Sequence, residues 1–133
     1  MPHPLDQARY ISLETYRKTG AAVRTPVWFA AASDGPTRFY VYTTTDAGKT
    51  KRIRRNSTVK IAPCDMRGTV AGPWFDATAD IVANEEFVDG MRLLNRKYRP
   101  WKQVLDLAAK LFGRHQRAML CIRPTPTGDA TRG

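Results

Sequence analysis

The sequence is poor in the residues that several common classes of protein require. Its only cysteines, Cys64 and Cys121, are far apart and in no metal-binding spacing, so we expect buried free thiols. No third ligand accompanies the two histidines, His3 and His115, so the sequence predicts no metal site. No apolar run approaches the roughly 20 residues of a membrane span. Residues 1–6 also lack the features of a signal peptide. We therefore expect a cytoplasmic protein that binds no membrane.

Acidic residues are also scarce, and this shortage shapes the expected partners. The 133 residues include 12 Asp and Glu against 22 Lys and Arg, a net charge of +10. Such a charge suits nucleic acid, an anionic membrane or an acidic small molecule. No Ser/His/Asp constellation, catalytic carboxylate pair or P-loop is present. Their absence does not count against a redox enzyme, in which the cofactor supplies the chemistry.

The length and composition indicate one folded domain. The chain is close to the commonest domain size, and 42% of its residues are hydrophobic, which is enough for a core. We expect the domain to span 1–124. The tail 125–133 has no apolar anchor and is expected to be flexible.

The positive charge is densest in the segment 43–55. Hydroxyl groups at Thr43 and Thr44 are followed by a turn at Gly48 and then by five cations in seven residues, which are Lys49, Lys51, Arg52, Arg54 and Arg55. Hydroxyls, turn amides and cations are good donors to phosphate. The alternatives are a solvated basic loop or a nucleic-acid patch. The aromatic residues lie in apolar runs and are not interleaved with the cations, which disfavours nucleic acid.

The hydrophobic periods predict a mainly β chain with late helices. We expect strands over 10–17, 23–30, 37–43, 58–64, 74–82 and 118–124, a short helix or turn over 49–56, and helical stripes over 87–98 and 101–112. Pro26 removes a ladder donor from the second strand, so it predicts a sheet edge, a bulge or a site where something other than a strand pairs. Several antiparallel strands with a late helical insert favour a small α+β barrel.

Short motifs in a fixed order resemble one known family. They are 13–18, 25–28, 42–44, 48–49, 52–56, 59–65, 67–68, 72–74 and 96–98. The combination resembles the pyridoxamine-phosphate-oxidase-like split barrels. It is most similar to their actinobacterial branch of coenzyme F420-dependent oxidoreductases. The resemblance covers nearly the whole chain.

This resemblance implies a fold and an assembly. The expected fold is a six-stranded antiparallel split barrel of the FMN-binding type, with two helices before the last strand. The expected assembly is a homodimer that holds a flavin or deazaflavin in each of two grooves at the subunit interface.

The resemblance also assigns binding residues. In flavin-binding members, a Ser or Arg followed by Lys grips the cofactor phosphate four residues before an Ile or Leu. Lys49 has that spacing from Ile53, whereas Gly48 replaces the preceding polar residue. The remaining candidates for the phosphate, the ring system or its cover are Thr25, Pro26, Val27, Trp28, Thr43, Thr44, Lys51, Arg52, Arg55 and Trp74. For Trp74, packing in the core or interface is the favoured alternative.

The predicted function is reduction of an unsaturated small molecule by hydride from reduced coenzyme F420. F420 carries a phosphodiester and a glutamate tail, and the surplus of cations fits so anionic a ligand. Three alternatives stay open: an FMN-dependent oxidoreductase of the same fold, a non-enzymatic carrier of F420, and, least favoured, a nucleic-acid-binding module. The sequence identifies no catalytic residue.

Overall fold

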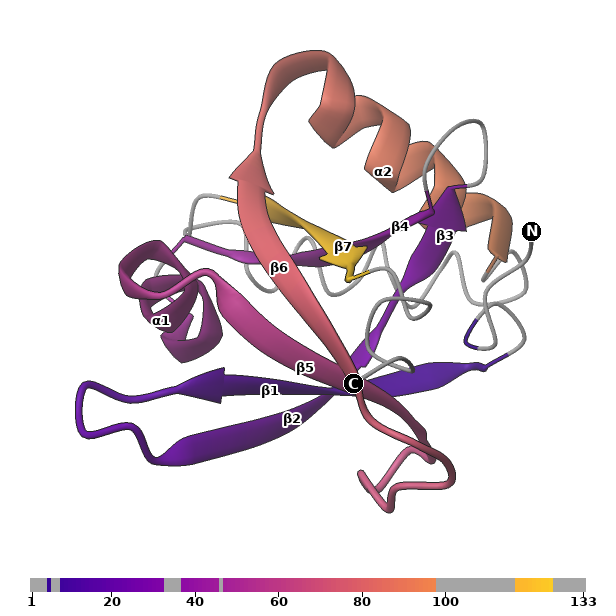
Figure 1. The fold of residues 1–133 in the computed structure, drawn as a ribbon. Coiled ribbons are helices and arrows are strands. Elements are labelled where there is room, and N and C mark those ends of the chain that lie inside the picture. Colours follow the sequence, from indigo (N-terminus) through magenta and orange to yellow (C-terminus); the bar gives the residue numbers. More distant parts are fainter. Residues whose placement is uncertain (1–4, 6–7, 33–36, 46, 98–116, 126–133) are drawn as a thin grey trace.

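The described residues form a single curled antiparallel sheet with two helices (Figure 1). The structure is a computed structural model that describes residues 5, 8–32, 37–45, 47–97 and 117–125. Its elements are β1 (Tyr10–Tyr16), β2 (Ala22–Trp28), β3 (Ala30–Ala32), β4 (Arg38–Thr44), α1 (Gly48–Arg55), β5 (Thr58–Cys64), β6 (Phe75–Val82), α2 (Asn84–Lys97) and β7 (Arg117–Pro124). No helix among the described residues is both long and apolar enough to span a membrane.

The sheet closes on itself through the backbone at Phe29. The strand order is β2-β1-β5-β6-β7-β4-β3, so β2 and β3 lie at opposite edges although only Phe29 separates them in sequence. The chain therefore leaves the ladder with β1 after Trp28 and enters the ladder with β4 at Ala30. This connection joins the two edges and gives the split barrel, which confirms the predicted fold class.

The predicted number of strands was wrong. The described part of the chain forms seven strands instead of six, because the expected strand 23–30 is divided at Phe29 between two ladders. The expected edge position of Pro26 is confirmed, since β2 pairs only with β1 among the described strands. The segment expected to be a helix or a turn is the helix α1. The expected stripe 101–112 lies outside the described residues.

Two apolar layers follow from the alternation of side chains along the strands. Phe39 and Val41 of β4 face the barrel interior with residues such as Leu13 and Ile61. The intervening Tyr40 and the cysteine Cys121 of β7 face outwards, where α2 covers them. Both cysteines are buried and unpaired, as the sequence predicts.

The short helix α1 is amphipathic and covers one end of the barrel. Ile53 packs into the barrel core, and Thr50 is fully buried. The hydroxyl of Thr50 donates to the carbonyl oxygen of Thr44 at 2.8 Å, which fastens the first turn of α1 to the end of β4. Eight residues are too few for a stable isolated helix, so these contacts hold it in place. These contacts therefore also fix the position of the backbone that carries the cations of α1.

Candidate cofactor-binding site

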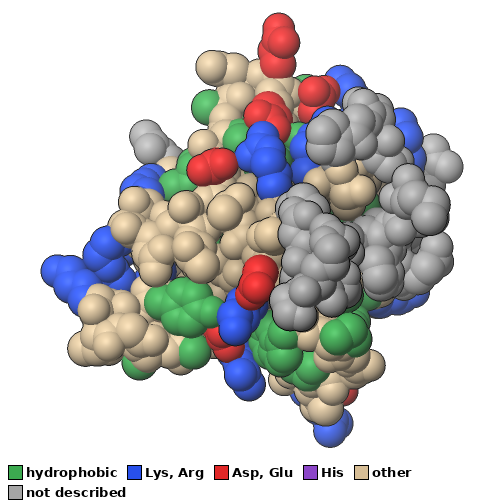
Figure 2. Space-filling model, viewed as in Figure 1, with side chains coloured by type: hydrophobic (Ala, Val, Ile, Leu, Met, Phe, Trp, Pro, Cys, Tyr) green, Lys and Arg blue, Asp and Glu red, His purple; other side chains and the backbone are tan. Residues whose placement is uncertain are grey.

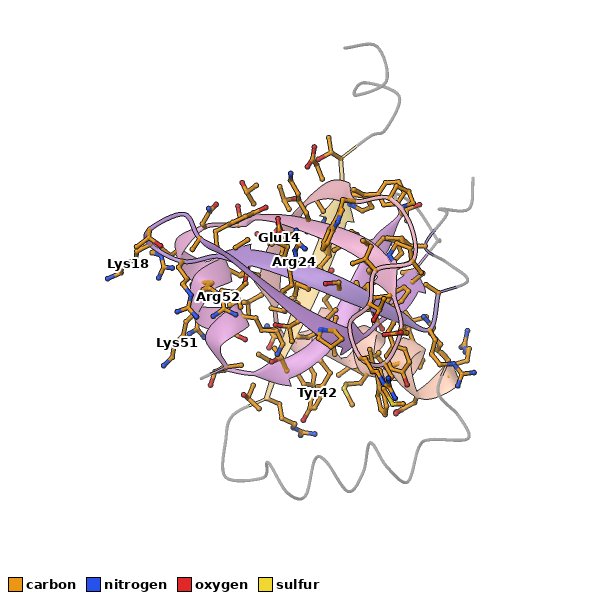
Figure 3. The ribbon with its side chains drawn as sticks, turned by 90° about the horizontal axis from the view of Figure 1, so that it is seen from below. Glu14, Lys18, Arg24, Tyr42, Lys51 and Arg52 are labelled. Carbon is orange, nitrogen blue, oxygen red and sulfur yellow. The ribbon has the colours of Figure 1, made fainter. Side chains whose placement is uncertain are left out.

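A cluster of cations forms where α1 meets the turn between β1 and β2. Figure 2 shows Lys and Arg side chains on the side of the molecule where these elements lie, and Lys18, Lys51 and Arg52 lie together in Figure 3. Two hydrogen bonds join the elements: Arg52 Nε donates to Thr15 Oγ1 at 2.6 Å, and Arg55 Nη2 donates to the carbonyl oxygen of Tyr16 at 3.2 Å. The cluster is thus built from two segments far apart in sequence.

The cations of this cluster are Arg17, Lys49, Arg52 and Arg55. Within the described ranges they form no ion pair with a carboxylate. Burial lowers the pKa of the Lys49 ammonium, and the charge of Arg52 lowers it further. Burial, followed by the charges of Arg17 and Arg55, lowers the pKa of Arg52. Like charges held together without compensation are relieved by an anion, so the geometry suits an anionic ligand.

The two threonines at the end of β4 face different environments. Thr43 continues the inward-facing row of Phe39 and Val41 and is buried, whereas Thr44 is half-buried on the other face. The carbonyl of Thr44 accepts the hydrogen bond from Thr50 that positions α1. The binding roles of Thr43 and Thr44 stay predictions, and the observed contribution of Thr44 is to fix the helix that carries Lys49.

The four predicted residues of β2 also divide between the faces of the sheet. Val27 is buried in the barrel core, and Thr25 lies opposite Leu13 on the same face. Pro26 is exposed, and Trp28 packs on the outer cluster under α2. Because β2 pairs only with β1 among the described strands, one side of its backbone has no ladder partner there. The binding roles of these four residues stay predictions, and β2 offers a backbone edge without a ladder partner among the described strands.

Trp74 does not join the cation cluster. It precedes β6, and the guanidinium of Arg24 lies 4.7 Å from the centre of its ring. The same guanidinium donates from Nε to Glu14 Oε1 at 2.8 Å, and the Tyr16 hydroxyl donates to Oε2 at 2.6 Å. Burial raises the pKa of the Glu14 carboxyl, but these hydrogen bonds outweigh it and the pKa is lowered. One face of Trp74 is thus occupied by a paired arginine, and its predicted role as a ring cover stays a prediction.

Sequence reasoning missed the part of the cluster that comes from β1 and its turn. The sequence assigns no role to Arg17 or Thr15, which lie in the expected strand 10–17. No local pattern links them to α1, which follows them by more than thirty residues in the sequence. The alternation in β1 could have shown only that Thr15 shares a face with Leu13.

A hollow of about 590 Å³ lies elsewhere, at the start of α2. Its wall includes Tyr40, whose hydroxyl accepts from Arg38 Nε and donates to Glu86 Oε2, both at 2.8 Å. Glu85 and Asp89 also line it. Acidic groups are stabilised near the N-terminus of a helix, which is the positive end of its dipole. None of the predicted site residues lines this hollow, and its excess of carboxylates does not suit an anionic cofactor.

The chain belongs to the pyridoxamine 5'-phosphate oxidase family. The model of this family, described as pyridoxamine 5'-phosphate oxidase, matches residues 4–127. No curated protein matches the chain in sequence.

Solved structures share the fold at low sequence identity. An F420 reductase has a TM-score of 0.58 and 22% identity, over 95% of this chain and 97% of its own. The heme storage protein HutZ from Vibrio cholerae has a TM-score of 0.64 and 16% identity, over 90% of this chain and 84% of its own. A protein from Clostridium acetobutylicum related to general stress protein 26 has a TM-score of 0.62 and 16% identity, over 90% and 78% of the two chains. These similarities show the split-barrel fold.

Proposed function

We propose that this protein is an oxidoreductase that uses reduced coenzyme F420 to transfer hydride to an unsaturated small molecule. The observation that carries the proposal is the cluster of Lys49, Arg52, Arg55 and Arg17, which has no acidic counter-charge among the described residues. Such a cluster fits the phosphodiester of this cofactor, and the surplus charge fits its glutamate tail. Oxidoreductases occur in the family, and an F420 reductase shares the fold.

In this proposal each element has a physical task. Lys49 and Arg52 bind the phosphate, while Arg55 and Lys51 attract the acidic tail. The backbone of β2 at Thr25–Val27, on the side that has no ladder partner among the described strands, orients the ring system. The cofactor, when bound, supplies the hydride, and the protein supplies position and electrostatics.

The choice of cofactor is tested by titrating the protein with F420 and with FMN under the same conditions. We expect tighter binding of F420, because the cluster holds more cations than one phosphate needs. We also expect the affinity to fall as salt is added, since exposed charges are screened within about 10 Å at 0.1 M salt. Equal or tighter binding of FMN would favour the FMN-dependent alternative.

An activity measurement separates an enzyme from a carrier. Reduced F420 is mixed with the protein and a panel of conjugated acceptors, and its reoxidation is followed by absorbance. Reoxidation that needs both the protein and an acceptor is the expected result. Tight F420 binding without such turnover would instead favour a carrier.

We also propose that the protein is a homodimer. The edge strand β2 leaves one row of backbone groups without a ladder partner among the described strands, and a second subunit would complete a groove there. Light scattering should give a mass of about 30 kDa, twice the 15.0 kDa of the chain. A stable monomer that binds the cofactor with full affinity would contradict this proposal.

A further inference from the structure

The side chain of Arg52 lies in the space that a side chain at position 48 would enter. A β-carbon placed on Gly48 would lie 2.8 Å from Nη1 of Arg52 and 3.6 Å from its Cζ. The two positions are four residues apart on α1, and side chains on a helix lean towards its N-terminus. The glycine therefore leaves room for the guanidinium to lie against the first turn.

The guanidinium is held there by a partner outside α1. Its Nε donates to the hydroxyl of the buried Thr15 at 2.6 Å. Nη1 and Nη2 remain, with four N–H donors between them. The first turn beside them begins after Ala47, which has no side chain that could cap it. Lys49 belongs to the same turn, so an ammonium and a guanidinium are presented together.

A purely structural role for Arg52 does not explain this arrangement. A hydrogen bond that only joins α1 to β1 needs one donor to the Thr15 hydroxyl. A neutral side chain could supply that donor. The structure instead places a full charge beside Lys49, Arg17 and Arg55, each of which raises the electrostatic cost of that charge. An anion bound between these groups removes that cost.

We propose that Arg52 takes the place of the missing side chain at position 48 and is the second phosphate ligand beside Lys49, and that Gly48 is required to admit its guanidinium. This inference rests on the proposed function, because the phosphate in question is that of the bound cofactor. It makes Gly48 and Arg52 a coupled pair, in which a change at one position alters the effect of a change at the other. Thr15 is the positioning residue that fixes the guanidinium.

The pair is tested by titrating F420 and FMN into the wild-type protein and four variants. Arg52→Ala should weaken binding of the tighter cofactor by about 10-fold to 100-fold, as expected for a charge-assisted hydrogen bond. Arg54→Ala is the matched control, because it removes the same charge from the same helix. Arg54 is exposed and donates from Nη1 to the Thr45 carbonyl oxygen at 3.2 Å. Its loss should cost less than about fivefold.

The effect of a substitution at position 48 on cofactor affinity should differ in sign between the wild-type protein and the Arg52→Ala variant. Gly48→Ser in the wild-type protein should weaken binding, because its β-carbon displaces Nη1. The thermal stability should persist, since the displaced atoms are the end of a flexible side chain. In the Arg52→Ala background the same serine enters the vacated space and should restore part of the affinity. Such a reversal is not expected from a general loss of charge or from misfolding.

The outcomes separate this inference from the function on which it rests. The inference is overturned if Arg52→Ala binds like Arg54→Ala, if Gly48→Ser binds like the wild type, or if the double variant binds no more tightly than Arg52→Ala. In each of these cases the wild type still binds the cofactor, and the proposed function stands. If the wild type binds neither F420 nor FMN, the proposed function fails and the inference fails with it.

Discussion

Replacing Lys49 by alanine is expected to weaken cofactor binding by about tenfold to hundredfold. The substitution removes one charge-assisted contact to phosphate, which contributes roughly 1.5–3 kcal/mol. Lys49 has no ion-pair partner among the described residues, so its loss leaves no carboxylate unpaired there. Alanine is also a good helix former, so α1 should persist. Direct titration with F420 and FMN gives the affinity, and circular dichroism checks the fold.

The matched control for this prediction is Lys60→Ala. Lys60 is an exposed cation of β5 that lies opposite Glu14 and Asp76 in the sheet and does not belong to α1. Its removal changes the net charge by the same amount but should change the affinity little. If both variants bind like the wild type, or if Lys60→Ala is the more damaging, the phosphate lies elsewhere.

Phe29→Ala should cause the largest loss of stability. The ring is fully buried where the chain passes from β2 to β3, and it meets Phe39 edge-to-face with 5.4 Å between ring centres. The ammonium of Lys97 also lies 3.4 Å from the centre of the Phe29 ring. Truncation of such a side chain leaves a cavity and costs about 3–5 kcal/mol. For a domain of this size, the melting temperature should fall by about 10–20 °C.

The control for Phe29→Ala is Met66→Ala, because the apolar side chain of Met66 is 72% exposed. Its truncation should change stability by about 0.5 kcal/mol or less. Thermal unfolding of the three proteins is compared at one protein concentration, since association would shift the midpoint. Similar midpoints for Phe29→Ala and Met66→Ala would show that Phe29 does not hold the junction between the two ladders.

Local sequence patterns predicted most of the strands. The expected strands 10–17 and 37–43 match β1 and β4 to within one residue at each end, whereas α2 begins at Asn84, three residues before the expected stripe 87–98. The division of the second strand was not predictable. Residues 27–32 are apolar throughout, with no glycine or proline to mark the point where the chain changes ladders.

The candidate site was predictable only where it is local. The density of cations on α1 is visible in the sequence, and so is the spacing of Lys49 from Ile53. The contact between Arg52 and Thr15 depends on how α1 lies across the barrel, which no local pattern encodes. The stacking of Arg24 on Trp74 likewise joins β2 to the start of β6, and it gives Trp74 a partner that the sequence could not indicate.

The position of β7 in the sheet has a consequence for the nascent chain. β7 is the last described strand to be synthesised, yet it lies between β6 and β4. Before it leaves the ribosome, β2, β1, β5 and β6 can form one sheet, whereas β4 and β3 can form only a separate hairpin. Until then the apolar side chains of β4 and the open edge of β6 stay exposed, as targets for chaperones or for misassembly. The barrel can therefore close only after β7 has been synthesised.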